Sequence, residues 1–336
     1  EVLSEAVWQA IAPTGDFTQT NPDAGQPSSQ KTEVRILYTD NAIYFGIVCF
    51  DDDPATIVVA DSRRDAPLND TDSLQIILDT YLDEQNGFVF GTNPAGLEYD
   101  GQLTKSGAES GFNINWDGVW RVETQQGEFG WSAEFMIPFK TLRYPTRDSQ
   151  TWGMNIQRNI RRRNENAYWA PLSQQFNLFR ISDAGLLTGL EISRQRNLKV
   201  TPYVLGEASD IGVAGRDTDI EWGLDVKYSL TPALTLDLTY NTDFAQVEAD
   251  ESVVSLERFN IFLPEKRPFF LENAGLFSVG KPGQVELFFS RRIGLSEDGE
   301  VIPIEGGARV SGALGGVNVG MMYMQTDALS GVSSSN

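Results

Sequence analysis

The first 192 residues consist of short β-rich runs, and the 3.6-residue period of a helix is scarce among them. Gly, Asn, Asp and Pro separate the runs, and Asp40-Asn41 predicts a tight hairpin turn. The run Ala42–Phe50 is apolar on both faces, which is typical of a central strand that is covered on both sides. Many short strands with frequent turns predict a β-sandwich. Strands are predicted at residues 33–39, 42–50, 56–60, 73–79, 87–92, 98–104, 118–123, 131–137 and 151–159.

From Leu198 the pattern changes to strict alternation. In Glu221–Leu230 the apolar side chains point one way and the polar ones the other. After the short turn Thr231-Pro232, Leu234–Tyr240 alternates in the same way. Period two over about ten residues, with aromatic residues at the ends, is what a tilted membrane-spanning strand needs. A soluble sandwich edge is the alternative source of this pattern.

Further strands are predicted at residues 198–206, 252–262, 285–292, 301–312 and 317–327, and Gly315-Gly316 joins the last two. A membrane barrel must close to satisfy its backbone groups, and bacterial barrels have an even number of strands, usually eight or more. Seven predicted strands lead us to expect that the chain ends before its barrel is complete. The predicted fold is therefore all-β, with a sandwich over residues 1–192 and the N-terminal part of an outer-membrane barrel over residues 198–336.

Loop lengths predict the orientation in a bacterial outer membrane. Short turns of such barrels face the periplasm and long loops face outward. Thr231-Pro232 is short, whereas the link over residues 207–220 is long and rich in Gly and Asp. The strand from Leu198 is therefore expected to begin on the periplasmic side, and so is the sandwich that precedes it.

The amino-acid composition excludes several kinds of partner, catalytic site and metal site. The chain has 26 basic and 47 acidic residues, a net charge of −21, which disfavours nucleic acid as a partner. It has no histidine, which excludes Ser-His-Asp and Cys-His catalysis, histidine zinc sites and histidine-ligated haem. With one cysteine and five methionines, zinc and haem are not expected. Cys49 lies in an apolar run and is expected to be a buried free thiol. The sequence contains no apolar run of about 20 residues, so no transmembrane helix is expected. A chain that starts at Glu1 is expected to be a mature form.

The first half resembles the family 9 carbohydrate-binding module and its relatives, in the version found in front of an outer-membrane barrel domain of unknown function. The resemblance covers about residues 1–192 and implies a sugar-binding type of sandwich. The matching stretches, in order, are SEAVWQA, TEVRILYTDNAIYFGIVCFDDDP, SRRD, NDTDSLQIILDTYLD, FGTNPAGLEYDG, WDGVW, GWSAEFMIPFKTLRY and WGMNIQRNIRR.

The second half resembles that outer-membrane barrel domain. Two stretches carry the match, SLTPALTLDLTYNTDFAQVEAD and RFNIFLPEKRPFFLENAGLF. The second stretch holds Glu265, Lys266, Arg267 and Glu272 among phenylalanines. It is interpreted as a constriction of the barrel lumen, as an interdomain contact, or as a structural ion-paired turn.

Sugar recognition uses aromatic rings for the apolar faces of the sugar and bidentate polar groups for its hydroxyls. Residues of both kinds stand near predicted turns and form the candidate ligand set: Trp116, Trp120, Tyr168, Trp169, Arg63, Arg64 and Arg161. The alternative for Trp120, as for Trp131 and Trp152, is a place in the core.

Calcium is the expected metal, because it takes oxygen ligands and the predicted loops are acidic. The candidate ligands are Asp51, Asp52, Asp53, Asp70 and Asp72, with Asp100 beside another loop. Their spacing is not that of a twelve-residue helix–loop–helix calcium site. The alternative is that these carboxylates are solvated or cap strands.

The leading functional hypothesis is a non-catalytic outer-membrane protein that binds or takes up a glycan. Its expected partners are a poly- or oligosaccharide, outer-membrane lipid and a protein partner in a surface complex. The first alternative is a glycoside hydrolase, which needs two carboxylates at a set separation. Glu98, Asp100, Asp117 and Glu134 supply carboxylates, but no pattern pairs them. The second alternative is a structural subunit that docks on a larger complex.

Overall fold

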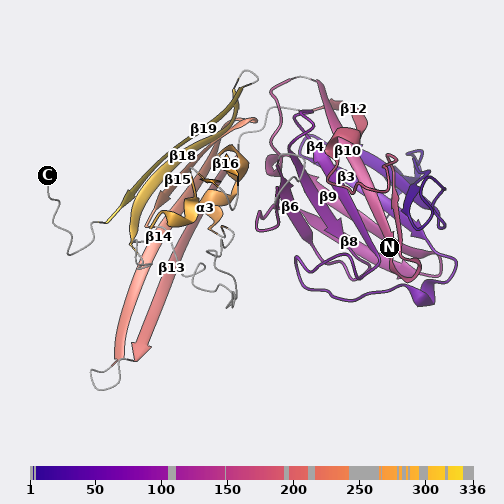
Figure 1. Ribbon diagram of the computed structural model, residues 1–336, viewed down its shortest axis with the longest axis horizontal. Helices are drawn as coiled ribbons and strands as arrows, with labels where there is room; N and C mark the ends of the chain where they lie inside the picture. Colours follow the sequence, from indigo (N-terminus) through magenta and orange to yellow (C-terminus); the bar gives the residue numbers. More distant parts are fainter. Residues whose placement is uncertain are drawn as a thin grey trace. The chain divides into compact units, whose positions relative to one another are not determined.

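The computed structural model is nearly all β with antiparallel sheets, which confirms the predicted fold class. It describes residues 3, 5–104, 111–147, 149–192, 197–210, 216–241, 265, 267–277, 280–281, 285–286, 288–294, 302–314 and 317–327. The chain divides into two compact units, Glu1–Gln195 and Arg196–Asn336 (Figure 1). Within the described ranges, every helix is too short or too polar to traverse a lipid bilayer.

Two antiparallel sheets form the first unit. The smaller sheet has the order β2–β3–β9–β8, and the larger has the order β1–β11–β10–β4–β5–β6–β7, with β12 also paired to β10. The smaller sheet contains β2 (Thr32–Tyr38), β3 (Ala42–Phe50), β9 (Gly130–Pro138) and β8 (Arg121–Gly127). The larger contains β1 (Thr18–Asn21), β11 (Glu165–Tyr168), β10 (Ser149–Ile160), β4 (Ser73–Asp79), β5 (Gly87–Thr92), β6 (Tyr99–Leu103), β7 (Phe112–Asn113) and β12 (Gly185–Glu191). Short helical turns connect them: α1 (Ala6–Gln9), η1 (Pro54–Thr56), η3 (Phe139–Thr141), η4 (Arg161–Arg163) and η5 (Ile181–Asp183).

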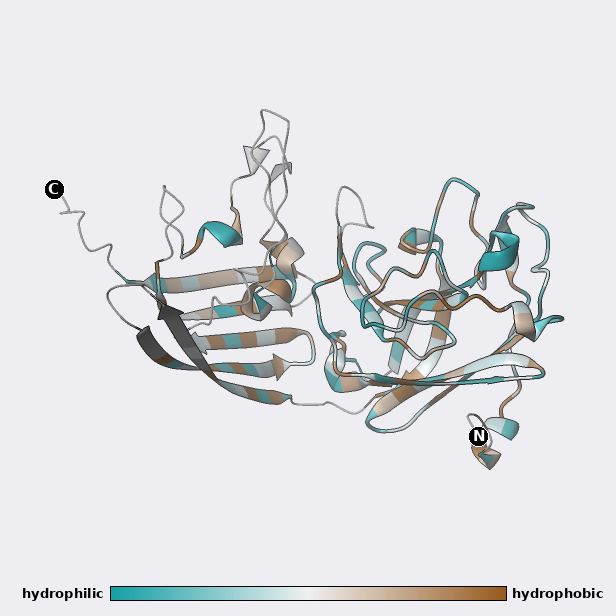
Figure 2. Ribbon diagram, turned by 90° about the horizontal axis from the view of Figure 1, so that it is seen from below, coloured by the Kyte–Doolittle hydropathy of each residue, from teal (hydrophilic) through white to brown (hydrophobic). Residues whose placement is uncertain are grey.

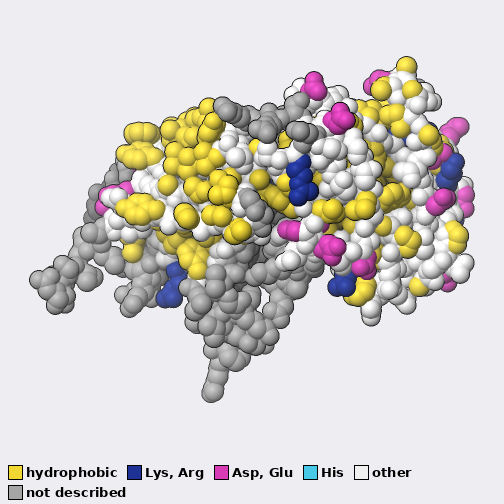
Figure 3. All heavy atoms as spheres, turned by 90° about the horizontal axis from the view of Figure 1, so that it is seen from above, with side chains coloured by type: hydrophobic (Ala, Val, Ile, Leu, Met, Phe, Trp, Pro, Cys, Tyr) yellow, Lys and Arg dark blue, Asp and Glu magenta, His cyan; other side chains and the backbone are white. Residues whose placement is uncertain are grey.

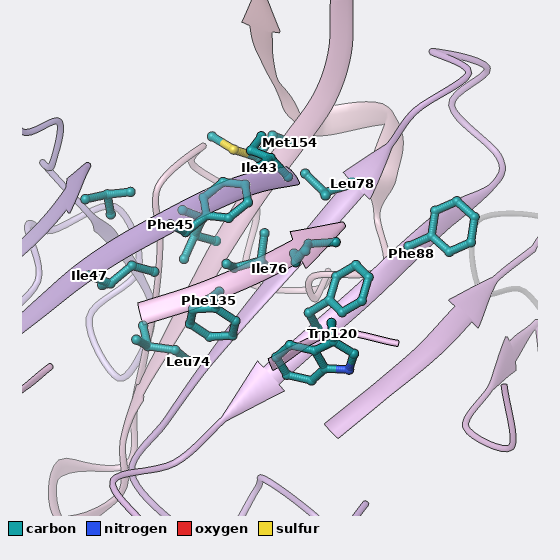
Figure 4. Close-up of a cluster of buried hydrophobic side chains, with 14 of the residues drawn as sticks. Ile43, Phe45, Ile47, Leu74, Ile76, Leu78, Phe88, Trp120, Phe135 and Met154 are labelled. Atoms are coloured by element: carbon teal, nitrogen blue, oxygen red, sulfur yellow. The ribbon is translucent and has the colours of Figure 1, made fainter. Parts of the chain in front are cut away.

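The main hydrophobic core of the first unit takes side chains from both sheets (Figure 4). Phe45 and Phe135 of the smaller sheet belong to the same buried cluster as Ile76 of the larger sheet. The outer face of β3 is covered as well, because Gly46 lies directly under the ring of Trp8 from α1. Residues 42–50 therefore form a central strand covered on both faces, as the sequence predicts.

Cys49 is a buried free thiol, as expected from its apolar run. Burial raises the pKa of this thiol to about 11, so it stays protonated and unreactive at neutral pH.

Most strands of the first unit lie where they are predicted, and β3, β4 and β5 have the predicted bounds. The predicted strand at residues 118–123 overlaps only the start of β8. The predicted strand at residues 56–60 is wrong. There, the backbone N–H of Val58 donates to the carboxylate of Asp72 at 2.8 Å, and the carbonyl oxygen of Val58 accepts the backbone N–H of Asp72 at 2.8 Å. Val58 thus bonds to Asp72 and not to a ladder along a neighbouring strand. Strands β1, β7 and β11 are too short to leave a pattern in the sequence.

The second unit is built on one antiparallel sheet with the order β13–β14–β15–β18–β19. Its strands are β13 (Leu198–Asp210), β14 (Arg216–Thr231), β15 (Leu234–Tyr240), β18 (Ile304–Leu314) and β19 (Val317–Thr326). Polar and apolar residues alternate along these strands (Figure 2). The connection from β15 to β18 includes α3 (Pro268–Leu271), η7 (Ala274–Leu276), η8 (Ser290–Arg292) and the short pair β16 (Gly280–Lys281) and β17 (Val285–Glu286).

The second unit differs from its predicted elements in two places. The link over residues 207–220 is not a long loop, because β13 and β14 pair from Leu198–Tyr228 as far as Asp210–Arg216. The strand predicted at residues 285–292 is reduced to β17, and η8 follows it. The strand predicted at residues 252–262 lies outside the described residues.

A buried carboxylate at the end of β4 makes the stability of the first unit depend on pH. Asp79 is fully buried and accepts backbone N–H groups from Asp83 and Glu84, and burial raises its pKa to about 6. The folded state then holds the proton more tightly than the unfolded state. This stabilisation is complete below about pH 4 and is lost as the pH rises to about 6.

We therefore expect Asp79→Asn to flatten the pH profile. Between pH 4 and 6 the unfolding free energy of the wild type should fall, relative to the variant, by on the order of 2 kcal/mol. Urea unfolding at several pH values measures this difference. Parallel profiles for the two proteins would contradict the assignment.

Candidate functional site

Three of the four predicted aromatic ligand residues are core residues. Trp116 is 7% exposed, Trp120 4% and Tyr168 2%. The two tryptophan rings pack on core phenylalanines: Trp116 lies 5.1 Å from Phe88, and Trp120 lies 5.2 Å from Phe90, between ring centroids. Because these ring faces are already covered, the structure corrects the expectation that Trp116, Trp120 and Tyr168 stack on a ligand.

Trp169, the fourth predicted aromatic residue, is half-buried. Its indole N–H donates to the hydroxyl of Thr14 at 3.1 Å, and Gly185 lies against its six-membered ring. The ring packs against the main core. Of the predicted set, it is the one aromatic side chain that keeps a partly exposed surface.

Arg64 is the centre of a charged cluster, which we call the Arg64 cluster, formed with Asp65, Glu98, Asp100 and Asp117. Its guanidinium donates to Glu98 at 2.7 Å, to Asp100 at 2.6 Å and to Asp117. The side chains differ in exposure, from 1% for Asp100 through 31% for Glu98 to 75% for Asp117. The buried carboxylate therefore anchors the cluster, and the exposed ones face solvent.

Asp100 links the cluster to the loop that carries the tryptophans. One of its oxygens accepts from Arg64, and the other accepts the backbone N–H of Gly118 at 2.6 Å. Burial raises the pKa of Asp100 to about 6, although the Gly118 N–H and Arg64 act to lower it. At neutral pH Asp100 is thus ionised and paired, and below about pH 6 it becomes protonated and weakens its hold on Arg64.

The stretch Trp116–Trp120 forms the loop beside the Arg64 cluster. Both tryptophans point into the core, and a side chain at Gly118 would collide with the Trp116 ring. Asp117 is left pointing outward between them. The sequence predicts Arg64 as a ligand residue, but it gives Glu98, Asp100 and Asp117 only as catalytic candidates, with Asp100 also a calcium candidate. These three carboxylates are 34 to 53 residues away from Arg64 in the sequence, so no local motif pairs them with it.

The remaining predicted arginines lie elsewhere. Arg63 is exposed and pairs with its neighbour Asp61 at 2.6 Å. Arg161 pairs with Asp70 at 3.2 Å. Glu134, another carboxylate considered for catalysis, lies on β9 opposite Gly46 and Glu123 in register, and the charges that act on it are those of Glu5 and Glu123.

The predicted calcium ligands meet arginines in this structure. Arg162 donates to Asp51 at 2.6 Å and to Asp52 at 2.7 Å, and Arg163 donates to Asp52 at 2.8 Å. Asp53 donates its backbone N–H to Asp51, and Asp72 is buried beside them with one oxygen that has no hydrogen-bond partner. Over the described ranges, no three Asp, Glu or Cys side chains group in a way that could hold a metal ion. Calcium binding stays a prediction, which chelation followed by thermal unfolding would test.

The sheet of the second unit has an exposed apolar face. The side chains that alternate onto this face are largely hydrophobic, and many are exposed by more than a third: Leu198, Val200, Val204, Ile220, Trp222, Leu230, Leu238, Tyr240, Leu314, Val317, Met321 and Tyr323. Figure 3 shows hydrophobic side chains gathered over the second unit, with few charged side chains among them. An exposed apolar surface of this extent marks an interaction with protein or lipid.

Over β15 and β18, the opposite, polar face of the same sheet is covered, whereas Lys199 and Thr201 on β13 are exposed. On β15, Thr235, Asp237 and Thr239 are buried, as are Arg309 and Ser311 on β18. Arg309 donates to Asp237 at 3.1 Å, and Thr239 donates to Asp225 at 2.6 Å. We call this sheet inverted, because its polar and charged side chains are buried over β15 and β18 while its apolar face is exposed.

Comparisons with known proteins give partial matches. Residues 195–305 match the family model of DUF5916, a domain of unknown function. No curated protein matches the chain. The solved structures that are similar to it include the following two. A candidate carbohydrate-binding protein from Bacteroides uniformis ATCC 8492 is 12% identical with a TM-score of 0.45, over 54% of this chain and 87% of that one. A family 9 carbohydrate-binding module from Caldicellulosiruptor kristjanssonii, in complex with cellotriose, is 16% identical with a TM-score of 0.40, over 56% and 86%.

Proposed function

We propose that the chain belongs to a bacterial outer-membrane protein whose second unit lies in the lipid bilayer. The observation that carries this proposal is the inverted sheet, whose exposed face is apolar and whose covered face holds Asp237 and Arg309. Membrane strands alternate lipid-facing apolar residues with polar residues that face a lumen. In water, such an apolar face would be left without a partner, whereas lipid chains cover it at no cost.

Turn lengths support an orientation. β14 and β15 are joined by two residues, and so are β18 and β19. Both connections start from the same end of the sheet, where Ala313 donates its backbone N–H to the carbonyl oxygen of Ala233. The 63-residue connection between β15 and β18 leaves from the other end. Short turns are typical of the periplasmic side. Leu198 pairs with Tyr228 near the short-turn end, so β13 and the unit before it are proposed to start in the periplasm.

Two measurements test the membrane proposal. The protein should fractionate with outer membranes, and its folded form should migrate differently from its heated form on denaturing gels. Both behaviours follow if β13 to β19 contribute to a closed barrel in lipid. Recovery of the intact protein in the soluble fraction, with no heat-dependent mobility, would refute the proposal.

For the first unit we propose non-catalytic binding of an oligosaccharide at the Arg64 cluster. The resemblance of its sequence stretches to family 9 carbohydrate-binding modules suggests the ligand class. The cluster supplies the chemistry, because carboxylates and a guanidinium form directional, charge-assisted hydrogen bonds with sugar hydroxyls. Asp117 and Glu98 would accept hydrogen bonds from sugar hydroxyls, and the buried Asp100 would hold Arg64 in position.

Replacing Asp117 with Asn is expected to weaken this binding about tenfold or more, since hydrogen bonds to charged groups contribute about 1.5–3 kcal/mol. Cellotriose is the first probe, measured by titration calorimetry at pH 7. Asp70→Asn is the matched control, because Asp70 is 76% exposed and also pairs with a single arginine, Arg161. Equal affinities for the wild type and both variants would remove the Arg64 cluster as the site.

The glycosidase alternative is decided by the same reagents. Asp100, with its raised pKa, and the neighbouring Glu98 have the unlike environments that an acid and a base require. Release of reducing sugar by the wild type, abolished in Asp100→Asn, would assign an enzyme. Binding without release assigns the module that we propose.

A further inference from the structure

The polar face of the second sheet carries a row of charges across four strands. Lys199, Lys227, Asp237 and Arg309 are register partners in turn, from β13 through β14 and β15 to β18. Asp237 lies 3.1 Å from Arg309 and 3.7 Å from Lys227, so it is shared between two cations. The next row holds Asp225, which accepts from Thr239. Because Asp237 carries one negative charge and contacts two cations, it does not fully balance the positive charge of Lys227.

Residues 267–277, which we call the inner segment, supply the missing charge. Glu272 of this segment pairs with Lys227, and its side chain is 5% exposed. Phe269 and Phe277 lie on Arg309, with the guanidinium 5.4 and 5.6 Å from their ring centroids. Asn273 donates to the hydroxyl of Ser311 at 3.2 Å. The inner segment therefore covers the polar face through β14 and β18.

The inner segment also has a compact structure of its own. The guanidinium of Arg267 is almost fully buried and binds Glu265 at 2.8 Å and the carbonyl oxygens of Ser290 and Ile293 at 2.8 and 2.9 Å. The same guanidinium lies 4.2 Å from the ring centroid of Phe270. These contacts join the segment to η8, not to the sheet, so they persist if the segment moves away from the sheet.

The two sets of contacts differ in kind. Within the segment a buried arginine is fully hydrogen-bonded, and removing its partners would be strongly unfavourable. Against the sheet, the polar contacts are an ion pair, two cation–π contacts and one hydrogen bond, and Leu276 and Phe277 also pack on Gly320 of β19. Water or a passing polar solute can replace the polar contacts, which are the ones that the proposed latch uses.

We propose that the inner segment is a plug on the lumen side of the membrane sheet, and that the Lys227–Glu272 ion pair is the latch that holds it shut. This inference rests on the proposed membrane function, under which the polar face lines a passage for polar solutes. When the latch is released, the segment leaves as one body with η8 and exposes Lys227 and Arg309 to the solute.

The latch is tested by Glu272→Gln, which removes the charge and keeps the size of the side chain. In planar bilayers containing the purified protein, we expect this variant to spend at least tenfold more time conducting than the wild type. Glu221→Gln is the matched control, since Glu221 is an exposed carboxylate on the same strand as Lys227. It should conduct as the wild type does. Equal conductance of Glu272→Gln and the wild type would overturn the latch.

The plug itself is tested by tethering. In a Cys49→Ala background, Asn273→Cys and Ser311→Cys are bridged by a short, reducible bis-methanethiosulfonate reagent. Conductance should disappear on bridging and return on addition of dithiothreitol, with no change in the background protein. Unaltered conductance through a full cycle would overturn the plug.

The outcomes separate the plug from the membrane proposal. Heat-modifiable mobility and vesicle insertion are recorded for every variant before conductance. Failure of all variants, the background included, to insert would refute the membrane function and the plug with it. Normal insertion, together with conductance that neither Glu272→Gln nor tethering alters, would refute the plug alone.

Discussion

If the second unit lies in a bilayer as proposed, replacing Leu238 with arginine is expected to destabilise it by about 2–4 kcal/mol, the range for a basic residue at the bilayer midplane. Leu238 is exposed on the apolar face of β15, opposite Val226 and Ala308 in register. It lies at a level between Tyr228 and the Trp222–Tyr240 ring pair, which stand where interfacial aromatic residues would. The folding equilibrium in lipid should therefore fall roughly 30-fold or more. Folded and unfolded gel bands, measured in vesicles across a urea series, give this value.

Leu230→Arg is the matched control for depth. Leu230 is exposed on the same face but adjoins the turn at Pro232-Ala233, where a basic side chain reaches the headgroups. The same substitution there should destabilise by no more than about 1 kcal/mol. Equal losses at both positions, or no loss at Leu238, would show that the apolar face does not lie in a bilayer.

The sequence predicts the second unit best where one face must be apolar. Residues 234–240 form β15 with the predicted bounds, because alternation there is imposed by two very different surroundings. Prediction fails in residues 207–220, where both strands are polar. Backbone pairing continues there, for example from Glu207 to Asp219, since ladder hydrogen bonds do not depend on hydrophobic side chains.

The candidate site of the first unit is less predictable for a different reason. Trp116 and Trp120 flank a turn, and a turn residue can point either into the core or outward. The structure turns both rings inward, where burying each ring removes a large apolar area from water. Arg64 finds its carboxylates through strand pairing and loop placement over 34 or more residues, which no local pattern encodes.

The same long-range pairing places an arginine in the core of the first unit, and its removal is the second large effect that we expect. Arg158 on β10 is 1% exposed. It donates to the carbonyl oxygens of Lys31 and Phe50 at 2.8 and 2.7 Å, and to the hydroxyl of Thr32 at 3.0 Å. Because these acceptors belong to the smaller sheet and to the chain that leads into it, Arg158 joins the two layers of the sandwich.

Arg158→Leu is expected to lower the unfolding free energy of the first unit by about 3–5 kcal/mol, a large share of the 5–15 kcal/mol typical of a domain. Replacing a complete buried ion pair by apolar residues is often neutral, but here the partners are backbone carbonyls that remain buried and lose their donor. Burial raises the pKa of the Asp72 carboxylate and the charge of Arg158 acts against that rise, so the carboxylate would lose part of its compensation in the variant.

Tryptophan fluorescence during urea unfolding measures this loss, since six of the seven tryptophans lie in the first unit. Arg121→Leu is the control, because Arg121 is exposed on β8 and its replacement should change the unfolding free energy by no more than about 0.5 kcal/mol. If Arg158→Leu unfolds within 1 kcal/mol of the wild type, the two layers are held together by their apolar core alone. A loss near 4 kcal/mol would instead make this arginine a structural requirement of the sandwich, as its three short contacts with chain segments more than 100 residues away suggest.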